Sequence, residues 1–153
     1  MKKKKSLVIY LVLLNLFLTT LVFSAKESFA QTVPEKTLLA LSKKDHKLAI
    51  VDPNTLKVIV RIPVGSDPHE VIASSDGRTA YVSIYGGGSL HELDIIDLVA
   101  EKPLRNIDTR PLFGPHGLTF VNGKVWFTAE GSKAIGRYDP ATGKVEWSMG
   151  TGH

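Results

Sequence analysis

Three similar segments follow one another in this sequence, and an internal repeat of this kind limits the possible folds more than any other feature. A turn pattern, Asp-Pro-Xaa-Thr-Xaa-Lys-Val, occurs at residues 52–58 and 139–145, and Asp97 takes the corresponding place between them. The dipeptide Pro-His also recurs, at residues 68–69 and 115–116. The repeat length is in the low forties and leaves room for four strands per unit, which is typical of a β-propeller.

The third unit, residues 116–149, has the clearest strand pattern. Asn122-Gly123 separates two apolar runs by two residues, and this dipeptide favours a hairpin because both turn positions need φ > 0. A second turn, Asp-Pro-Ala-Thr-Gly, begins at Asp139. The sequence therefore predicts four antiparallel strands, at residues 117–121, 124–129, 134–139 and 144–149.

The same pattern divides the preceding sequence into one partial and one complete unit. Residues 37–64 contain only counterparts of the second, third and fourth strands, whereas residues 69–108 contain all four. We therefore expect an all-β chain, namely an incomplete β-propeller of four-stranded antiparallel blades with about two and three-quarter blades present. The propeller domain would span residues 31–153.

The apolar patterns of the strands predict where each one lies in its blade. The second strand of each unit is an almost unbroken apolar run, such as Leu-Leu-Ala-Leu at residues 38–41, whereas the fourth strand of the third unit alternates from Val145 to Met149. Unbroken runs are typical of strands buried on both faces, and alternation is typical of half-exposed strands. We expect buried inner strands and half-exposed outer strands.

Residues 1–30 have the pattern of a targeting segment. Four lysines come first, an apolar stretch occupies residues 7–23, and Ser-Phe-Ala at residues 28–30 puts small side chains where a signal peptidase cleaves. We expect a signal peptide that meets the membrane only during export, and a secreted or periplasmic protein. The alternative is an uncleaved transmembrane anchor, for which the apolar run is slightly short.

The targeting segment also accounts for the basic charge of the chain. It holds five of the 19 basic residues and one of the 15 acidic residues, so the remaining sequence has 14 of each. No basic and aromatic stripe is present, and we expect no nucleic-acid partner. The absence of cysteine excludes disulfides, thiolate metal sites and cysteine nucleophiles.

The repeats resemble two known groups of propeller repeats. Tyr-Val-Ser at residues 81–83, with the turn at residues 52–55, resembles the YVTN-type β-propeller repeat family. The third unit resembles the repeat of the virginiamycin B lyase (streptogramin lyase) family. The residues that match are 115–118, 125–128, 135–137 and 139–145. The resemblance implies a propeller fold, but such repeats occur in exported proteins of many functions.

Three units are fewer than the roughly four to eight blades of a closed propeller. The first blade of such a ring commonly takes its missing strand from the other end of the chain, and here His153 stands where the next first strand should begin. We therefore expect the N-terminal part of a longer propeller. The alternative is a short subunit that closes its ring by oligomerisation through open blade faces.

Four residues are candidates for a ligand-binding face. His69 and His116 begin the first strands of their units, and Glu130 ends the second strand of the third unit, where the second unit has Tyr85. The corresponding loops share one face of a propeller, around its channel. A histidine and a carboxylate there could bind a divalent metal or act as an acid–base pair. The alternative is that both histidines only cap their strands.

The lyase resemblance implies roles for two of these residues. In that family a histidine at the head of the first strand acts as acid and base, and a glutamate at the end of the second strand helps to hold magnesium. His116 and Glu130 match these positions. The reaction would open the ring of a cyclic depsipeptide by proton abstraction. Apart from this implied magnesium, no cofactor is indicated.

Two classes of function are therefore open. We expect a module that binds an unknown small molecule or protein through its loops, and the alternative is a magnesium-dependent carbon–oxygen lyase. Gly-Gly-Gly at residues 86–88 lacks the Lys-Ser/Thr of a phosphate loop and predicts a flexible connection. His91 and Glu92 are adjacent on a predicted strand and point to opposite faces, so we expect no metal site there.

The targeting segment leads to a direct test. We expect the mature protein to begin at Gln31, because cleavage follows the Ser-Phe-Ala sequence. Intact-mass analysis of the exported protein should give the mass of residues 31–153. Full-length protein found in the membrane fraction would instead support the uncleaved anchor.

Overall fold

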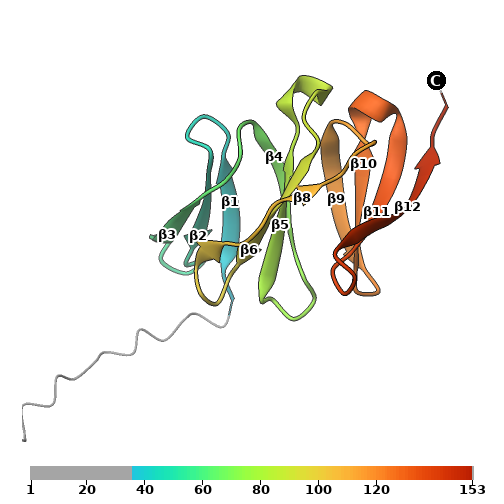
Figure 1. Cartoon of the computed structure of the whole chain (residues 1–153). Coiled ribbons are helices and arrows are strands. Elements are labelled where there is room, and N and C mark those ends of the chain that lie inside the picture. The colour runs from blue at the N-terminus through green and yellow to red at the C-terminus, as the bar shows by residue number, and fades with distance from the viewer. Residues whose placement is uncertain (1–35, 153) are drawn as a thin grey trace, which may run out of the picture. The chain divides into compact units, whose positions relative to one another are not determined.

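The computed structural model describes residues 36–152, whose regular secondary structure is almost entirely antiparallel β-strand (Figure 1). The expected signal peptide, residues 1–30, lies outside the described residues, as does the start of the predicted domain at residues 31–35. In the part that is described, no helix has the length and apolar character needed to cross a membrane.

The strands form three sheets, which we number as blades 1 to 3 in sequence order. Blade 1 contains β1 (Leu38–Ser42), β2 (Lys47–Val51) and β3 (Val58–Pro63). Blade 2 contains β4 (Pro68–Ala73), β5 (Thr79–Ile84), β6 (Glu92–Asp97), β7 (Lys102–Pro103) and β8 (Ile107–Asp108). Blade 3 contains β9 (Pro115–Val121), β10 (Lys124–Ala129), β11 (Ala134–Asp139) and β12 (Lys144–Gly150).

The strands of each blade pair with their sequence neighbours, as the repeat predicts. Those of blade 3 begin and end within two residues of the expected positions. The fourth strand of blade 2 differs, because β7 and β8 pair with β6 as two separate pieces. Pro103 lies in this outer strand, where the missing N–H of proline costs little.

Turn residues account for the accuracy of these boundaries. Asn122 and Gly123 have φ values of 50° and 75°, as a hairpin with two left-handed turn residues requires. The carboxylates of Asp52, Asp97 and Asp139 each accept hydrogen bonds from backbone N–H groups two residues further on. Each aspartate thereby fixes a turn, namely the one after β2, β6 or β11.

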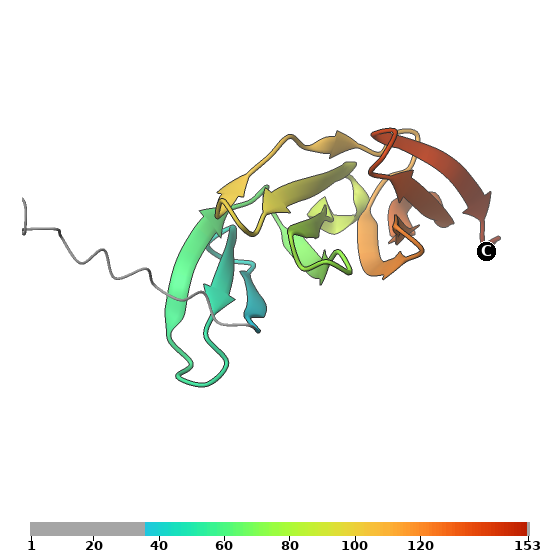
Figure 2. The same ribbon diagram turned by 90° about the horizontal axis from the view of Figure 1, so that it is seen from below.

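Two apolar clusters hold the blades together face to face. The first lies between blades 1 and 2 and includes Leu48 and Ile84, and the second lies between blades 2 and 3 and includes Leu93 and Phe127. In Figure 2 the three sheets lie side by side in sequence order. Blade 2 is therefore covered on both faces.

Burial matches the expected position of the strand in blade 2 but not in every blade. β10 is expected to be buried on both faces, but it alternates between buried residues and half-buried or exposed ones. β5 is buried from Ala80 to Ile84, and β12 alternates between half-buried and exposed residues over most of its length, as expected. In contrast, β1 is only half-buried, and Leu38 is 50% exposed. Within residues 36–152, no strand pairs with the inner edge of β1.

The face of blade 3 that points away from blade 2 is also uncovered by the described residues. Trp126 and Trp147 meet edge to face on it, with ring centroids 5.3 Å apart, and the Arg137 guanidinium lies 5.1 Å from the Trp126 ring. Glu146 holds Arg137 by an ion pair of 3.0 Å. Met149, 51% exposed, extends the apolar part of this face. Apolar faces of this kind are typical of interfaces.

We therefore expect the mature chain, residues 31–153, to form oligomers or aggregates and not a monodisperse monomer. Because the exposed side chain of Met149 lies on the open face, Met149→Lys should raise the monomer fraction measured by light scattering. Val99→Lys is a matched control, since Val99 is 61% exposed in a turn of blade 2. A monodisperse wild-type monomer with a sharp, reversible thermal transition would contradict this expectation.

Candidate functional site

Two histidines from neighbouring blades lie against each other. His69 on β4 and His116 on β9 have ring centroids 3.8 Å apart and ring planes inclined by 38°. Tyr85 follows β5 and meets both rings edge to face, with a centroid separation of 5.2 Å in each case. Three of the four residues predicted for the ligand face are thus in mutual contact.

A β-bulge in each blade directs these histidines. In β4, His69 and Glu70 together oppose the single residue Ser83 of β5. In β9, His116 and the following glycine likewise oppose the single residue Thr128 of β10. Bulges bend the strand and re-aim its side chains, and they are common next to active sites.

The hydroxyl group opposite each bulge takes the place of a ladder partner. Ser83 Oγ accepts a hydrogen bond from Glu70 N at 3.0 Å, and Thr128 Oγ1 accepts one from Gly117 N at 2.8 Å. Ser83 Oγ also donates to the His116 carbonyl oxygen at 2.7 Å. One buried hydroxyl group therefore joins both bulges and fixes the two histidine-bearing strands relative to each other.

Glu70 is the acidic residue closest to the histidine pair, although it is not among the residues predicted for the ligand face. Its Oε2 accepts a hydrogen bond from Leu118 N at 3.0 Å, and its Oε1 lies 3.8 Å from His116 Nδ1. One potential ligand atom from each of His69, Glu70 and His116 lies within 4.8 Å of the others. The third unit has Gly117 where the second has Glu70, so comparison of the repeats gave no signal for a carboxylate here.

Glu130 lies on the other side of Tyr85. It begins a short 3-10 helix, Glu130–Ser132. Its carboxylate interacts with the Tyr85 hydroxyl group, and this interaction is the main reason why the pKa of Tyr85 is raised. The other three predicted residues therefore lie around Tyr85. We call these four residues, together with Glu70, the histidine cluster.

The surroundings of His69 favour its neutral form. Burial lowers the pKa of His69, and the neighbouring His116 and Lys43 lower it further. The Lys43 ammonium is itself paired with Asp67 at 2.8 Å. His69 Nδ1 is buried and has no hydrogen-bond partner among the described residues.

Three glycines support the loops beside the cluster. A Cβ atom on Gly131 would lie 2.1 Å from the Gly88 carbonyl oxygen, and one on Gly114 would lie 2.7 Å from Gly88 Cα. Gly114, at φ 65°, donates to Leu90 O and accepts from Glu130 N. The connection at residues 86–88, which the sequence predicts to be flexible, forms a 3-10 turn packed on the loops of blade 3.

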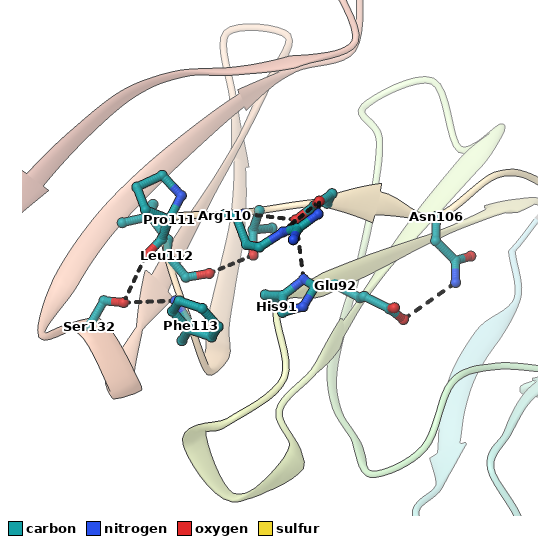
Figure 3. A network of polar contacts seen from close by, with 10 residues as sticks. His91, Glu92, Asn106, Arg110, Pro111, Leu112, Phe113 and Ser132 are labelled. Carbon is teal, nitrogen blue, oxygen red and sulfur yellow. Dashed lines mark hydrogen bonds and ion pairs between the residues drawn. The ribbon is translucent and has the colours of Figure 1, made fainter.

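A second polar network holds the crossover from blade 2 to blade 3 (Figure 3). Asp108 accepts a hydrogen bond from Arg110 Nε at 3.0 Å, and its carboxylate lies 3.1 Å from His91 Nδ1. The hydrogen bonds from Arg110 lower the pKa of Asp108. Ser132 Oγ, at the end of the glycine-packed loop, accepts from Phe113 N at 2.8 Å. His91 thus belongs to a structural ion-pair network.

Comparison with known proteins identifies the fold. No family model matches the chain, and no curated protein matches it. Among solved structures, hydrazine synthase from Kuenenia stuttgartiensis is similar with 25% identity and a TM-score of 0.66, over 73% of this chain and 33% of that one. Dihydro-heme d1 dehydrogenase NirN, in complex with DHE, is similar with 18% identity and a TM-score of 0.61, over 78% of this chain and 27% of that one.

Both of these neighbours are β-propeller proteins. This chain spans about a third of the length of the first and about a quarter of the second. Together with the three antiparallel sheets, the comparison confirms the expected fold class, an all-β, incomplete β-propeller.

The role of Ser83 can be tested by a matched pair of variants. Ser83→Ala leaves Glu70 N–H and the His116 carbonyl group buried without partners and should destabilise the fold by about 1–3 kcal/mol. Thr128→Ala removes the equivalent bond at an exposed position, where water can replace it, and should cost less. Thermal unfolding of both variants would measure the difference. Equal losses would contradict the bridging role.

Proposed function

We propose that this chain is an exported β-propeller module that binds a small polar molecule at the histidine cluster. The supporting observation is that two imidazoles, a phenol and two carboxylates from two blades gather at one position. The side chains of His116 and Glu70 are 33% and 45% exposed, so a ligand can reach them. Polar groups that converge at a partly exposed position are typical of ligand sites.

The chemistry of the cluster favours a ligand that carries hydrogen-bond donors or positive charge. Oε1 of Glu70 lies 3.8 Å from His116 Nδ1, beyond hydrogen-bond distance. Glu130 adds a second carboxylate, and the lysine closest to His69 is already paired with Asp67. A cationic or polyhydroxylated molecule would satisfy these acceptors at the smallest desolvation cost.

The magnesium-dependent lyase is a second candidate, favoured by the link from His116 through Tyr85 to Glu130. The magnesium ion that such a lyase would need fits the histidine cluster poorly. Magnesium prefers an octahedral shell of oxygen ligands, whereas two of the three side chains that converge here offer nitrogen. The activities of the two structural neighbours do not transfer either, because the chain covers only a third or less of each.

Membership of the YVTN-type repeat family and export also belong to this proposal. The Tyr-Val-Ser segment lies on β5, where Tyr81 and Val82 are buried and Ser83 bonds both bulges. In this interpretation the repeat motif supplies the core and the link between blades, and the loops supply binding. The basic and apolar pattern of residues 1–30 supports export.

A thermal-shift screen tests the proposal. Small cationic and polyhydroxylated compounds should raise the melting temperature of the wild-type protein, and the shift should disappear in Tyr85→Ala and His116→Ala. Trp126→Ala, on the open face of blade 3, is the control and should keep the shift. A shift lost only in Trp126→Ala would move binding to the open face and contradict the proposal.

One member of the screen separates the two functions. A streptogramin B-type cyclic depsipeptide should be added with magnesium, and its ring opening followed by mass spectrometry. Turnover that is lost in both His116→Ala and Glu130→Ala would favour the lyase. Binding without turnover would favour the binding module.

A further inference from the structure

We propose that His69, Glu70 and His116 bind a divalent first-row transition-metal ion, with Zn²⁺ as the reference ion. The inference rests on the proposed function, because it uses the same cluster, and it names one ligand of that site. It differs from the magnesium site implied by resemblance in both its metal and its carboxylate, which is Glu70 and not Glu130.

The distances between the ligand atoms suit one shared ion. Donor atoms around a tetrahedral zinc ion lie about 3.3 Å apart, given bond lengths of roughly 2.0–2.1 Å. In this structure the three donor atoms lie within 4.8 Å of one another. All three side chains are half-buried at the ends of strands, so small rotations about their side-chain bonds would bring the donor atoms to the required separation.

Glu70 is already oriented for coordination by its backbone partner. Leu118 N–H holds Oε2 at 3.0 Å, which leaves Oε1 directed toward His116. Contacts of this kind to the second oxygen of a carboxylate ligand are common in metal sites, because they fix the ligand before the ion arrives.

His69 provides a separate indication of a missing partner. Its Nδ1 is buried and has no hydrogen-bond partner among the described residues, and a bound ion or an ordered water molecule would satisfy such an atom. The ring packs against His116 on one side and Tyr85 on another, which keeps it beside the other proposed ligands. Burying this nitrogen is costly unless something binds to it.

The donor set selects the class of metal. Imidazole nitrogen suits zinc, copper, nickel and iron, whereas magnesium and calcium prefer oxygen. Three protein ligands also leave the fourth tetrahedral position open, as in zinc sites that bind a substrate or water. Tyr85 touches both histidine rings, and Glu130 interacts with its hydroxyl group, so these two residues lie beside the three ligands.

Calorimetric titration with Zn²⁺ alone tests the site, using protein purified without a histidine tag and treated with a chelator. The wild-type protein should bind one ion per chain, and Mg²⁺ should not compete. His69→Ala and His116→Ala should each weaken Zn²⁺ binding at least tenfold, since even outer-shell changes cost about 10–100-fold. Co²⁺ should bind with the visible absorption of a tetrahedral complex.

Two further variants keep the test decisive if an alanine variant fails to fold. Glu70→Gln can still accept the Leu118 hydrogen bond but loses its charge, and it should weaken Zn²⁺ binding with little change in melting temperature. His46→Ala removes an exposed histidine outside the cluster and should bind Zn²⁺ as the wild-type protein does. No saturable binding by the wild-type protein, or equal affinity in Glu70→Gln and the wild type, would overturn the proposal.

The outcome can be separated from that of the proposed function. Compounds that bind the metal-free protein and depend on Tyr85 and His116, without any Zn²⁺ binding, would refute the metal site alone. Zn²⁺ binding that depends on Glu70, with no compound that binds through Tyr85, would refute the binding module alone.

Discussion

The hydrogen bonds of one buried hydroxyl group determine how this molecule brings its polar residues together. Ser83 Oγ accepts a hydrogen bond from Glu70 N in the bulge of its own blade, where it replaces a bond between the two strands. It also donates a hydrogen bond to the His116 carbonyl oxygen in the bulge of the next blade, and so links the two blades. Apolar packing between the sheets is strong but non-directional. The directional bond fixes the relative position of His69 and His116, and hence the geometry of the cluster.

The cluster depends as much on a difference between the repeats as on their similarity. His69 and His116 are equivalent, and so are Ser83 and Thr128, but Glu70 corresponds to Gly117. A Cβ atom on Gly117 would lie 3.2 Å from Thr128 Oγ1 and 4.0 Å from Glu70 Oε2. The tight contact would be with Thr128 Oγ1, which accepts the hydrogen bond from Gly117 N, whereas the distance to Glu70 is ordinary van der Waals contact. Of the two equivalent positions, only the one in blade 2 supplies a carboxylate.

The sequence predicted the strands well because their boundaries are set by local chemistry. The hairpin at Asn122-Gly123 depends on the positive φ values of these two residues, and the turn at Asp139 depends on a hydrogen bond to its own side chain. Both features involve only residues that are neighbours in the sequence. Position along the chain also indicated that His69, Tyr85, His116 and Glu130 would lie on one face, because strand ends of the same kind meet there. The roles of these residues remain predictions.

What the sequence could not predict depends on contacts between blades or on register. The bulges are invisible in the apolar pattern, yet they re-aim His69 and His116, and through them Glu70 becomes part of the cluster. The split of the fourth strand of blade 2 into β7 and β8 depends on pairing with β6 and not on propensity. β1 is half-exposed because no strand among the described residues pairs with its inner edge. The apolar pattern of β1 itself gives no sign of this.

The packing of Gly88, Gly114 and Gly131 limits how such a protein can diversify. Because these backbones touch, a side chain at residue 114 or 131 would force the loops of blades 2 and 3 apart, so new specificity must come from other positions of these loops. The hairpins at the opposite ends of the strands are different, since nothing lies within 4 Å of a Cβ atom placed on Gly77 or Gly123. A peptide tag or an inserted domain would therefore be tolerated at these hairpins, which makes them suitable points for fusing this module to other proteins.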